Sequence, residues 1–126
     1  MELPSPFGVL LLSGRHERAH YALVLATGAA ALGRDVVLFA TNAGCRLFLD
    51  PCPLLADPRE AALEARGVAG VGTLLAAAAD LGLRRVACDA GLKAEDLAGR
   101  PLAPGVEVAG VATFLAEVGD GQMLSL

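Results

Sequence analysis

The sequence predicts a single α/β domain over residues 1–126, in which a mainly parallel sheet of five strands lies between layers of helices. Two observations support this fold class. Strand-like and helix-like segments alternate along the whole chain. The first strand-like segment is a continuous apolar run, which is typical of a strand that is buried on both faces. A chain of this length buries a substantial core without disulfides or metal ions.

The first three elements follow from plain patterns. Residues 7–13 form one apolar run and are expected to be a strand. Gly14 then turns the chain into a helix over residues 16–32, which is rich in Ala and Leu and stops at Gly33. β-Branched and aromatic side chains predict the second strand over residues 34–41.

The middle of the chain has a weaker pattern. Thr41 or Asn42 is suited to cap a short helix that reaches Leu49. Residues 51–70 contain three prolines and a brief helical stretch at 60–66. This composition predicts a mobile loop with one or two helical turns.

Regular alternation returns after residue 70, and turn signals at Gly99, Pro101 and Pro104 separate the last elements. In chain order we expect helix 71–81, strand 84–88, helix 93–97, strand 106–109, helix 111–118 and strand 122–126. Five strands with intervening helices predict a flavodoxin-like three-layer α/β/α sandwich.

The composition narrows the class of protein. Hydrophobic residues make up 55% of the chain and charged residues 19%, which is more apolar than an average soluble domain. No apolar run reaches the roughly 18 residues of a membrane span, and the N-terminus lacks the basic start of a secretory signal. We therefore expect a cytoplasmic protein that self-associates. A net charge of −4 and few aromatic residues argue against nucleic acid as a partner.

Cysteine usage and motif searches exclude several kinds of chemistry. Cys45, Cys52 and Cys88 have no metal-ligand spacing, and any disulfide scheme leaves one of them unpaired. A reducing compartment fits this pattern best. The sequence contains no P-loop, no dinucleotide fingerprint and no hydrolase nucleophile elbow. These absences leave the thiols as the candidate reactive groups.

Cys88 is the leading candidate for a functional residue because it ends the expected strand at 84–88. Parallel α/β sheets present their chemistry at the carboxyl ends of their strands, where backbone N–H groups stabilise a thiolate. Lys93 favours that thiolate and Asp89 opposes it, while Gly91 lets the backbone approach closely. The alternative interpretation is that Cys88 is a small apolar residue of the core.

Three further residues are auxiliary candidates. Cys45 follows the second strand, either as a redox partner of Cys88 at the same sheet edge or as a helix residue packed on the sheet. Arg15 and His16 follow the first strand, where they either hold an anion at the helix N-terminus or lie in solvent. His16 and His20 share one helix face, but no third ligand is evident and no metal is expected.

Three segments resemble those of a known family. They are Cys-Asp-Ala-Gly-Leu at 88–92, Glu-Asp-Leu at 95–97 and, most specifically, Pro-Gly-Val-Glu-Val-Ala-Gly-Val-Ala-Thr-Phe-Leu at 104–115. On these segments the chain resembles the DsrE/DsrF-like family of small sulfur-relay and sulfur-oxidation proteins. The opening strand and residues 33–39 agree more loosely, so the resemblance covers essentially the whole chain.

The resemblance implies a flavodoxin-like fold, homo- or hetero-oligomers that are commonly trimers or hexamers, and no cofactor. In active members of the family the cysteine that matches Cys88 carries sulfur as a persulfide. We therefore predict a sulfurtransferase or sulfur carrier that works through Cys88 with donor and acceptor proteins. Two alternatives stay open: a non-catalytic oligomeric binding or scaffold protein of this fold, and a small thiol-redox protein that uses Cys88 with Cys45.

Overall fold

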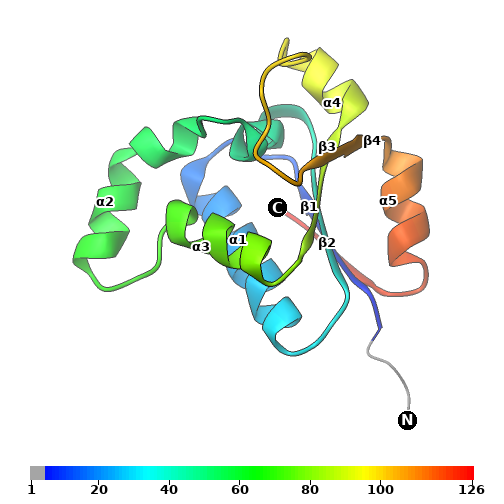
Figure 1. The fold of residues 1–126 in the computed structure, drawn as a ribbon, viewed down its shortest axis with the longest axis horizontal. Coiled ribbons are helices and arrows are strands. Elements are labelled where there is room, and N and C mark those ends of the chain that lie inside the picture. The colour runs from blue at the N-terminus through cyan, green and yellow to red at the C-terminus, as the bar shows by residue number, and fades with distance from the viewer. Residues whose placement is uncertain (1–4) are drawn as a thin grey trace.

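A parallel sheet forms the centre of the molecule in the computed structural model, which describes residues 5–126 (Figure 1). Every strand pairing within these residues is parallel, and the strand order is β4-β3-β2-β1-β5. The strands are β1 (Phe7–Leu11), β2 (Val36–Ala40), β3 (Arg84–Cys88), β4 (Glu107–Ala109) and β5 (Gln122–Ser125). The predicted α/β class with a flavodoxin-like layered sheet is confirmed.

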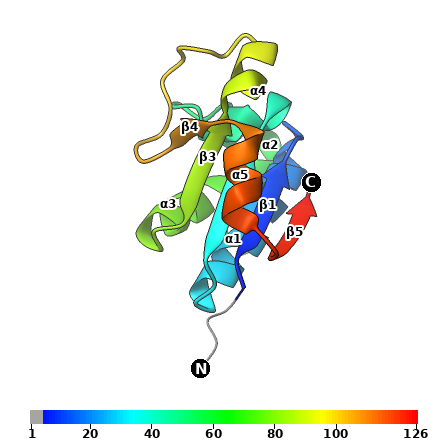
Figure 2. The same cartoon turned by 90° about the vertical axis from the view of Figure 1, so that its right-hand side faces the viewer.

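The handedness of the connections decides which helices cover which face of the sheet. The chain steps from β1 to β4 in one direction and then returns across the sheet to β5. Because crossovers between parallel strands are right-handed, the return places α5 on the opposite face from α1 and α3 (Figures 1 and 2). The helices are α1 (His16–Ala31), α2 (Pro58–Ala65), α3 (Val71–Asp80), α4 (Asp89–Ala94) and α5 (Val111–Val118), with 3₁₀ helices η1 (Asn42–Phe48) and η2 (Pro53–Ala56).

The two faces of the sheet carry separate cores because side chains alternate along each strand. On β2, Leu38 packs in the larger cluster that includes α1 and α3, which we call the α1 face. Phe39 packs in the smaller cluster on the opposite face, the α5 face, where its ring stacks on Phe114 of α5 at 4.8 Å between centroids. Gly8 of β1 lets α5 approach closely, since a Cβ there would lie 3.0 Å from the Phe114 ring.

Most expected boundaries agree with the structure to within two residues. The strand at 84–88 and the helix at 111–118 are confirmed at both ends. The helix expected at 93–97 is wrong, because α4 begins directly at Asp89 and ends at Ala94. Its stop lies close to Asp96, whose backbone has a positive φ of 56°.

The segment at 51–70 is more regular than its prolines suggest. It contains η2 and then α2, which begins at Pro58, two residues earlier than expected. Proline fits the first helical turn because the missing N–H has no helical partner there. Asp57 completes the start, since its side chain accepts a hydrogen bond of 2.8 Å from the N–H of Arg59. Thr41 stands at the N-cap of η1 as expected, but without a side-chain capping bond.

A buried carboxylate on α2 joins three helices. Glu60 Oε1 accepts the N–H of Val71 at 2.8 Å, and Oε2 accepts the N–H of Gly72 at 2.9 Å. These are the first two residues of α3, so Glu60 caps that helix from a distance in the chain. His16 Nε2 of α1 lies 2.7 Å from Oε1. Gly70 leaves room for this group, because a Cβ there would lie 2.7 Å from the carboxylate.

Burial alone would raise the pKa of Glu60, but the hydrogen bonds from Gly72, His16 and Val71 outweigh it and hold the pKa below its usual 4.5. A carboxyl group whose pKa is lowered by folding stabilises the protein above its ordinary pKa. That stabilisation disappears as the pH falls through the lower value.

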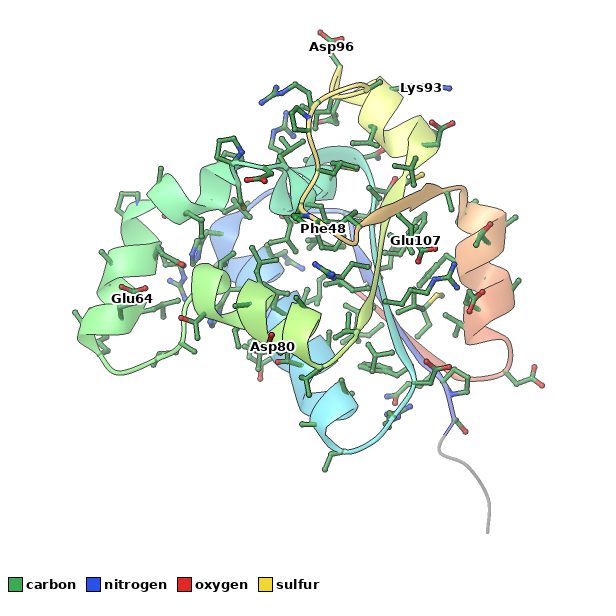
Figure 3. The ribbon with its side chains drawn as sticks, in the orientation of Figure 1. Phe48, Glu64, Asp80, Lys93, Asp96 and Glu107 are labelled. Atoms are coloured by element: carbon green, nitrogen blue, oxygen red, sulfur yellow. The ribbon has the colours of Figure 1, made fainter. Side chains whose placement is uncertain are left out.

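We predict that Glu60→Gln lowers the free energy of unfolding at neutral pH by about 1–3 kcal/mol, because the charged acceptor is lost. The difference from the wild type should shrink as the pH falls below 4.5, where Glu60 itself becomes protonated and resembles glutamine. Urea unfolding followed by circular dichroism across this range measures both effects. Glu64→Gln, at an exposed position of the same helix (Figure 3), is the control and should change little. Equal losses for the two variants would contradict the prediction.

Candidate functional site

Cys88 occupies the junction between β3 and α4. It is the last residue of the strand, where its backbone pairs with Ala109 of β4, and it is also the N-cap of α4. Its Sγ accepts the N–H of Gly91 at 3.4 Å. The thiol thus takes the place that a Ser or Asp side chain takes in other helix caps. A backbone N–H directed at sulfur stabilises negative charge on it.

The side chain of Cys88 lies on the α5 face, where it packs in the cluster of Val86, Phe39 and Phe114. The residue is 6% exposed. Its pairing partner Ala109 is followed at once by Gly110, the N-cap of α5. The first turns of α4 and α5 therefore both begin beside Cys88, on one edge of the sheet (Figure 2).

Gly91 fixes α4 against the end of β2. A Cβ on Gly91 would lie 2.5 Å from the backbone N of Asn42 and closer still to Thr41 Oγ1. Only glycine permits this approach. An ion pair of 2.7 Å lies nearby, between Arg46 of η1 and Glu95 just after α4. These contacts hold the N–H of Gly91 on the thiol.

Cys45 lies close to Cys88, but its side chain packs in the cluster of the opposite face. It is fully buried, and its thiol donates to the carbonyl of Ala40 at 3.5 Å. Burial raises the pKa of Cys45 to about 11, the backbone of Cys88 opposes that rise, and negative charge on Cys88 adds to it. The three cysteines are free, and Cys52 is 9% exposed.

The remaining predicted site residues make contacts elsewhere. Arg15 is exposed and pairs with Glu17 at 2.7 Å. His16 is buried against Glu60. Lys93 pairs with Asp89 at 3.2 Å, and Figure 3 shows its side chain directed away from the body of the molecule. Of the predicted auxiliary residues, the structure therefore brings Gly91 onto Cys88 and Cys45 near it.

Two polar residues were missed in the sequence, the buried Glu60 and the half-buried Arg85. Glu60 lies three residues after Asp57, which is the spacing of a capping box. That spacing predicts a hydrogen bond from Glu60 to the start of its own helix, so the sequence contains no sign of its bonds to α3. Arg85 lies on β3, where the nitrogen Nε is buried without a hydrogen-bond partner. A strand buried on both faces that contains two adjacent arginines was the signal that could have identified Arg85.

Within residues 5–126 no group of three or more His, Cys, Asp or Glu side chains is placed to hold a metal ion. None of the helices in this range is long and apolar enough to cross a membrane.

Comparison with known proteins identifies the fold. The crystal structure of the YchN protein from E. coli superposes with a TM-score of 0.76 at 14% identity, over 97% of this chain and 99% of that one. The chain shares its fold with YchN. MTH1491, a protein of unknown function from Methanobacterium thermoautotrophicum, gives a TM-score of 0.63 at 15% identity over the same shares of the two chains. No protein-family model and no curated protein sequence matches this chain.

We predict that Gly91→Ala destabilises the protein by about 1–3 kcal/mol, because the added methyl group must push α4 away from Thr41 and Asn42. Thermal unfolding measures the loss. Gly28→Ala is the matched control, since a Cβ at that exposed position of α1 meets nothing within 4 Å. Helix propensity should make this control more stable by about 0.5–1 kcal/mol. Two shifts of the same sign would refute the proposed close contact.

Proposed function

We propose that this protein is a DsrE/DsrF-like sulfur carrier in which Cys88 accepts sulfane sulfur as a persulfide and passes it to a partner thiol. The observation that supports this most directly is the N–H of Gly91, directed at Cys88 Sγ at the carboxyl end of a parallel strand. The fold shared with YchN and the resemblance of the segments at 88–92 and 104–115 agree with it.

The proposed reaction is a thiol exchange and needs no cofactor. The Cys88 thiolate attacks the outer, sulfane sulfur of a donor persulfide R–S–S⁻, forming a new S–S bond while the bond to the donor sulfur breaks. The donor leaves as the thiolate R–S⁻, and Cys88 becomes Cys–S–S⁻. A partner thiolate then attacks the outer sulfur in the same way, which returns Cys88 to its thiolate. No electrons are gained or lost overall.

The other two cysteines are less suited to this reaction. Burial raises the pKa of Cys45 to about 11 and also raises the pKa of Cys52, so both remain thiols at neutral pH. The side chain of Cys45 also lies in the cluster on the far side of the sheet from that of Cys88. This arrangement argues against the thiol-redox alternative that pairs these two residues.

One observation favours a second candidate, a non-catalytic oligomeric protein of the same fold. Cys88 is 6% exposed and packs against Val86, Phe39 and Phe114. Apolar burial of this kind is typical of an inert structural cysteine. The two candidates differ in one measurable property, which is whether the thiol accepts sulfur.

We predict that the wild-type protein gains single sulfur atoms when it is incubated with polysulfide and then examined by intact mass spectrometry. Cys88→Ser should lose this gain almost completely, because the acceptor atom is removed. Cys52→Ser is the matched control, since Cys52 is similarly buried and should be dispensable. Fragmentation of the labelled protein should place the added sulfur on Cys88. A wild type that gains no sulfur, or a Cys88→Ser variant that gains as much, would favour the scaffold candidate.

Self-association is a separate part of the proposal. Several large apolar side chains are exposed on one side of the molecule, from α5 and β5: Val111, Leu115 and Met123. Clustered exposed apolar side chains are typical of surfaces that bind another protein. We propose that the protein is a homo-oligomer that buries them.

We predict that light scattering at micromolar concentration gives a mass of at least two chains. Leu115→Glu should reduce that mass towards the monomer, because a charge would be buried in the interface. Leu32→Glu, on a highly exposed residue that follows α1, is the matched control. A monomeric wild type would exclude self-association.

A further inference from the structure

A mostly apolar cleft of about 440 Å³ lies on the α1 face of the molecule, away from the side chain of Cys88. Its walls come from η1, η2, α3 and the turn before β4, and include Leu47, Leu75, Ala76, Ala79 and Pro104. Clefts of roughly 300–1,000 Å³ with apolar walls and a few polar groups are the usual sites of small-molecule binding. The polar groups therefore indicate the class of ligand.

Arg85 supplies the cation in this cleft. On β3 it pairs in register with Leu38, which places its side chain on the α1 face. Its Nε atom is buried and has no hydrogen-bond partner among the residues that the structure describes. Among residues 5–126 no carboxylate lies within ion-pair distance of Arg85.

Arg84, the neighbour of Arg85 on β3, is a cation with a structural role. Arg84 is on the α5 face, where it forms ion pairs with Glu107 at 2.7 Å and with Glu117 of α5. Figure 3 shows Glu107 on this side of the sheet, toward α5. The two adjacent arginines of β3 therefore differ in whether a carboxylate pairs with them. Arg84 has two carboxylate partners, and Arg85 has none within the described part of the chain.

Arg85 is half-buried, and its Nε–H has lost its hydration without a hydrogen bond in return, which costs free energy. The turn above it fits closely, since a Cβ on Gly105 would lie 2.6 Å from Arg85 Nη2. Asp50 also lines the cleft, but it is exposed and forms no ion pair with Arg85. The missing counter-charge is therefore not supplied by the described residues of the chain.

We propose that the cleft binds a small organic carboxylate with an apolar body. The guanidinium of Arg85 pairs with the carboxylate, for which its planar fork of N–H donors is suited. The apolar body of the ligand lies against Leu47, Leu75 and Pro104. Cys52 lines the same cleft, but its thiol donates to the carbonyl of Arg46 at 3.6 Å and burial raises its pKa. Binding is therefore non-covalent and independent of sulfur transfer at Cys88.

Octanoate tests this proposal, with 1-octanol as the uncharged probe of the same length. Titration into ¹⁵N-labelled protein, followed by NMR, should give saturable shifts of the backbone amides of Leu75, Ala76 and Ala79. Octanoate should bind more tightly than 1-octanol by about 10- to 100-fold, the usual value of a charged hydrogen bond. Cys88→Ser should bind octanoate as the wild type does, so a failure of the sulfur-carrier proposal leaves this result unchanged.

Variants of the arginine assign the effect to its charge. Arg85→Gln should weaken the binding of octanoate by about 10- to 100-fold and leave the binding of 1-octanol unchanged. Arg85→Met should also lose octanoate binding, while its melting temperature rises above that of the wild type because a buried, unpaired N–H donor is removed. That rise also shows that the variant is folded. Arg66→Gln, on an exposed arginine after α2, is the matched control and should bind as the wild type does.

Three results would overturn the proposal. The first is the absence of saturable octanoate binding to the wild type. The second is equal binding of octanoate by Arg85→Gln and the wild type. The third is a set of shifts in the cleft amides that depends on protein concentration without any ligand, which would identify a second copy of the chain as the occupant.

Discussion

The carboxylate of Glu60 is the interaction on which the α1 face of this protein depends. It brings together the first residues of α3, the start of α1 and its own helix α2. A buried carboxylate is tolerated here because each of its oxygens accepts at least one hydrogen bond from a group that would otherwise be unpaired. Gly72 takes part in this network and also lines the apolar cleft, so the anchor of α3 and the wall of the cleft are one piece of structure.

The direction of the chain through the sheet separates the two places where ligands or partners are expected. The helices that connect β1 to β4 fill the α1 face and leave the Arg85 cleft between them. The single return crossing places α5 on the other face, next to the thiol of Cys88. Because side chains alternate between the two faces along β3, its residues contribute to different sites. Arg85 points to one core and Cys88, three residues later, to the other.

The features that the sequence predicted well are those that depend on local pattern. The helix at 111–118 lies between Gly110 and Gly119, and glycines at both ends of an apolar run mark such a segment clearly. The helix at 89–94 was missed because it contains Gly91, which lowers helix propensity. That glycine is needed for a contact with Thr41, far away in the chain, and local pattern carries no information on such contacts.

In the candidate site, too, local pattern predicted some features and long-range contacts decided the others. The position of Cys88 at a strand end followed from the apolar run before it, whereas its hydrogen bond from Gly91 depends on where α4 begins. His16 was expected either to hold an anion at the helix N-terminus or to lie in solvent, because it follows β1. It turns instead to Glu60, a residue whose partners are 11 to 44 positions away in the chain. Pairings over such separations are set by tertiary packing.

The pairing of β5 with β1 has a consequence for how the chain reaches this structure. β1 is synthesised before β5, with β2, β3 and β4 between them in the chain, yet β1 and β5 are neighbours, and Leu126 bonds back to Leu10 and Leu12. Until β5 arrives, one side of β1 presents unpaired N–H and C=O groups along an apolar strand, a template for pairing with other chains. During translation β1 is therefore open to aggregation along that side until β5 has been made and pairs with it.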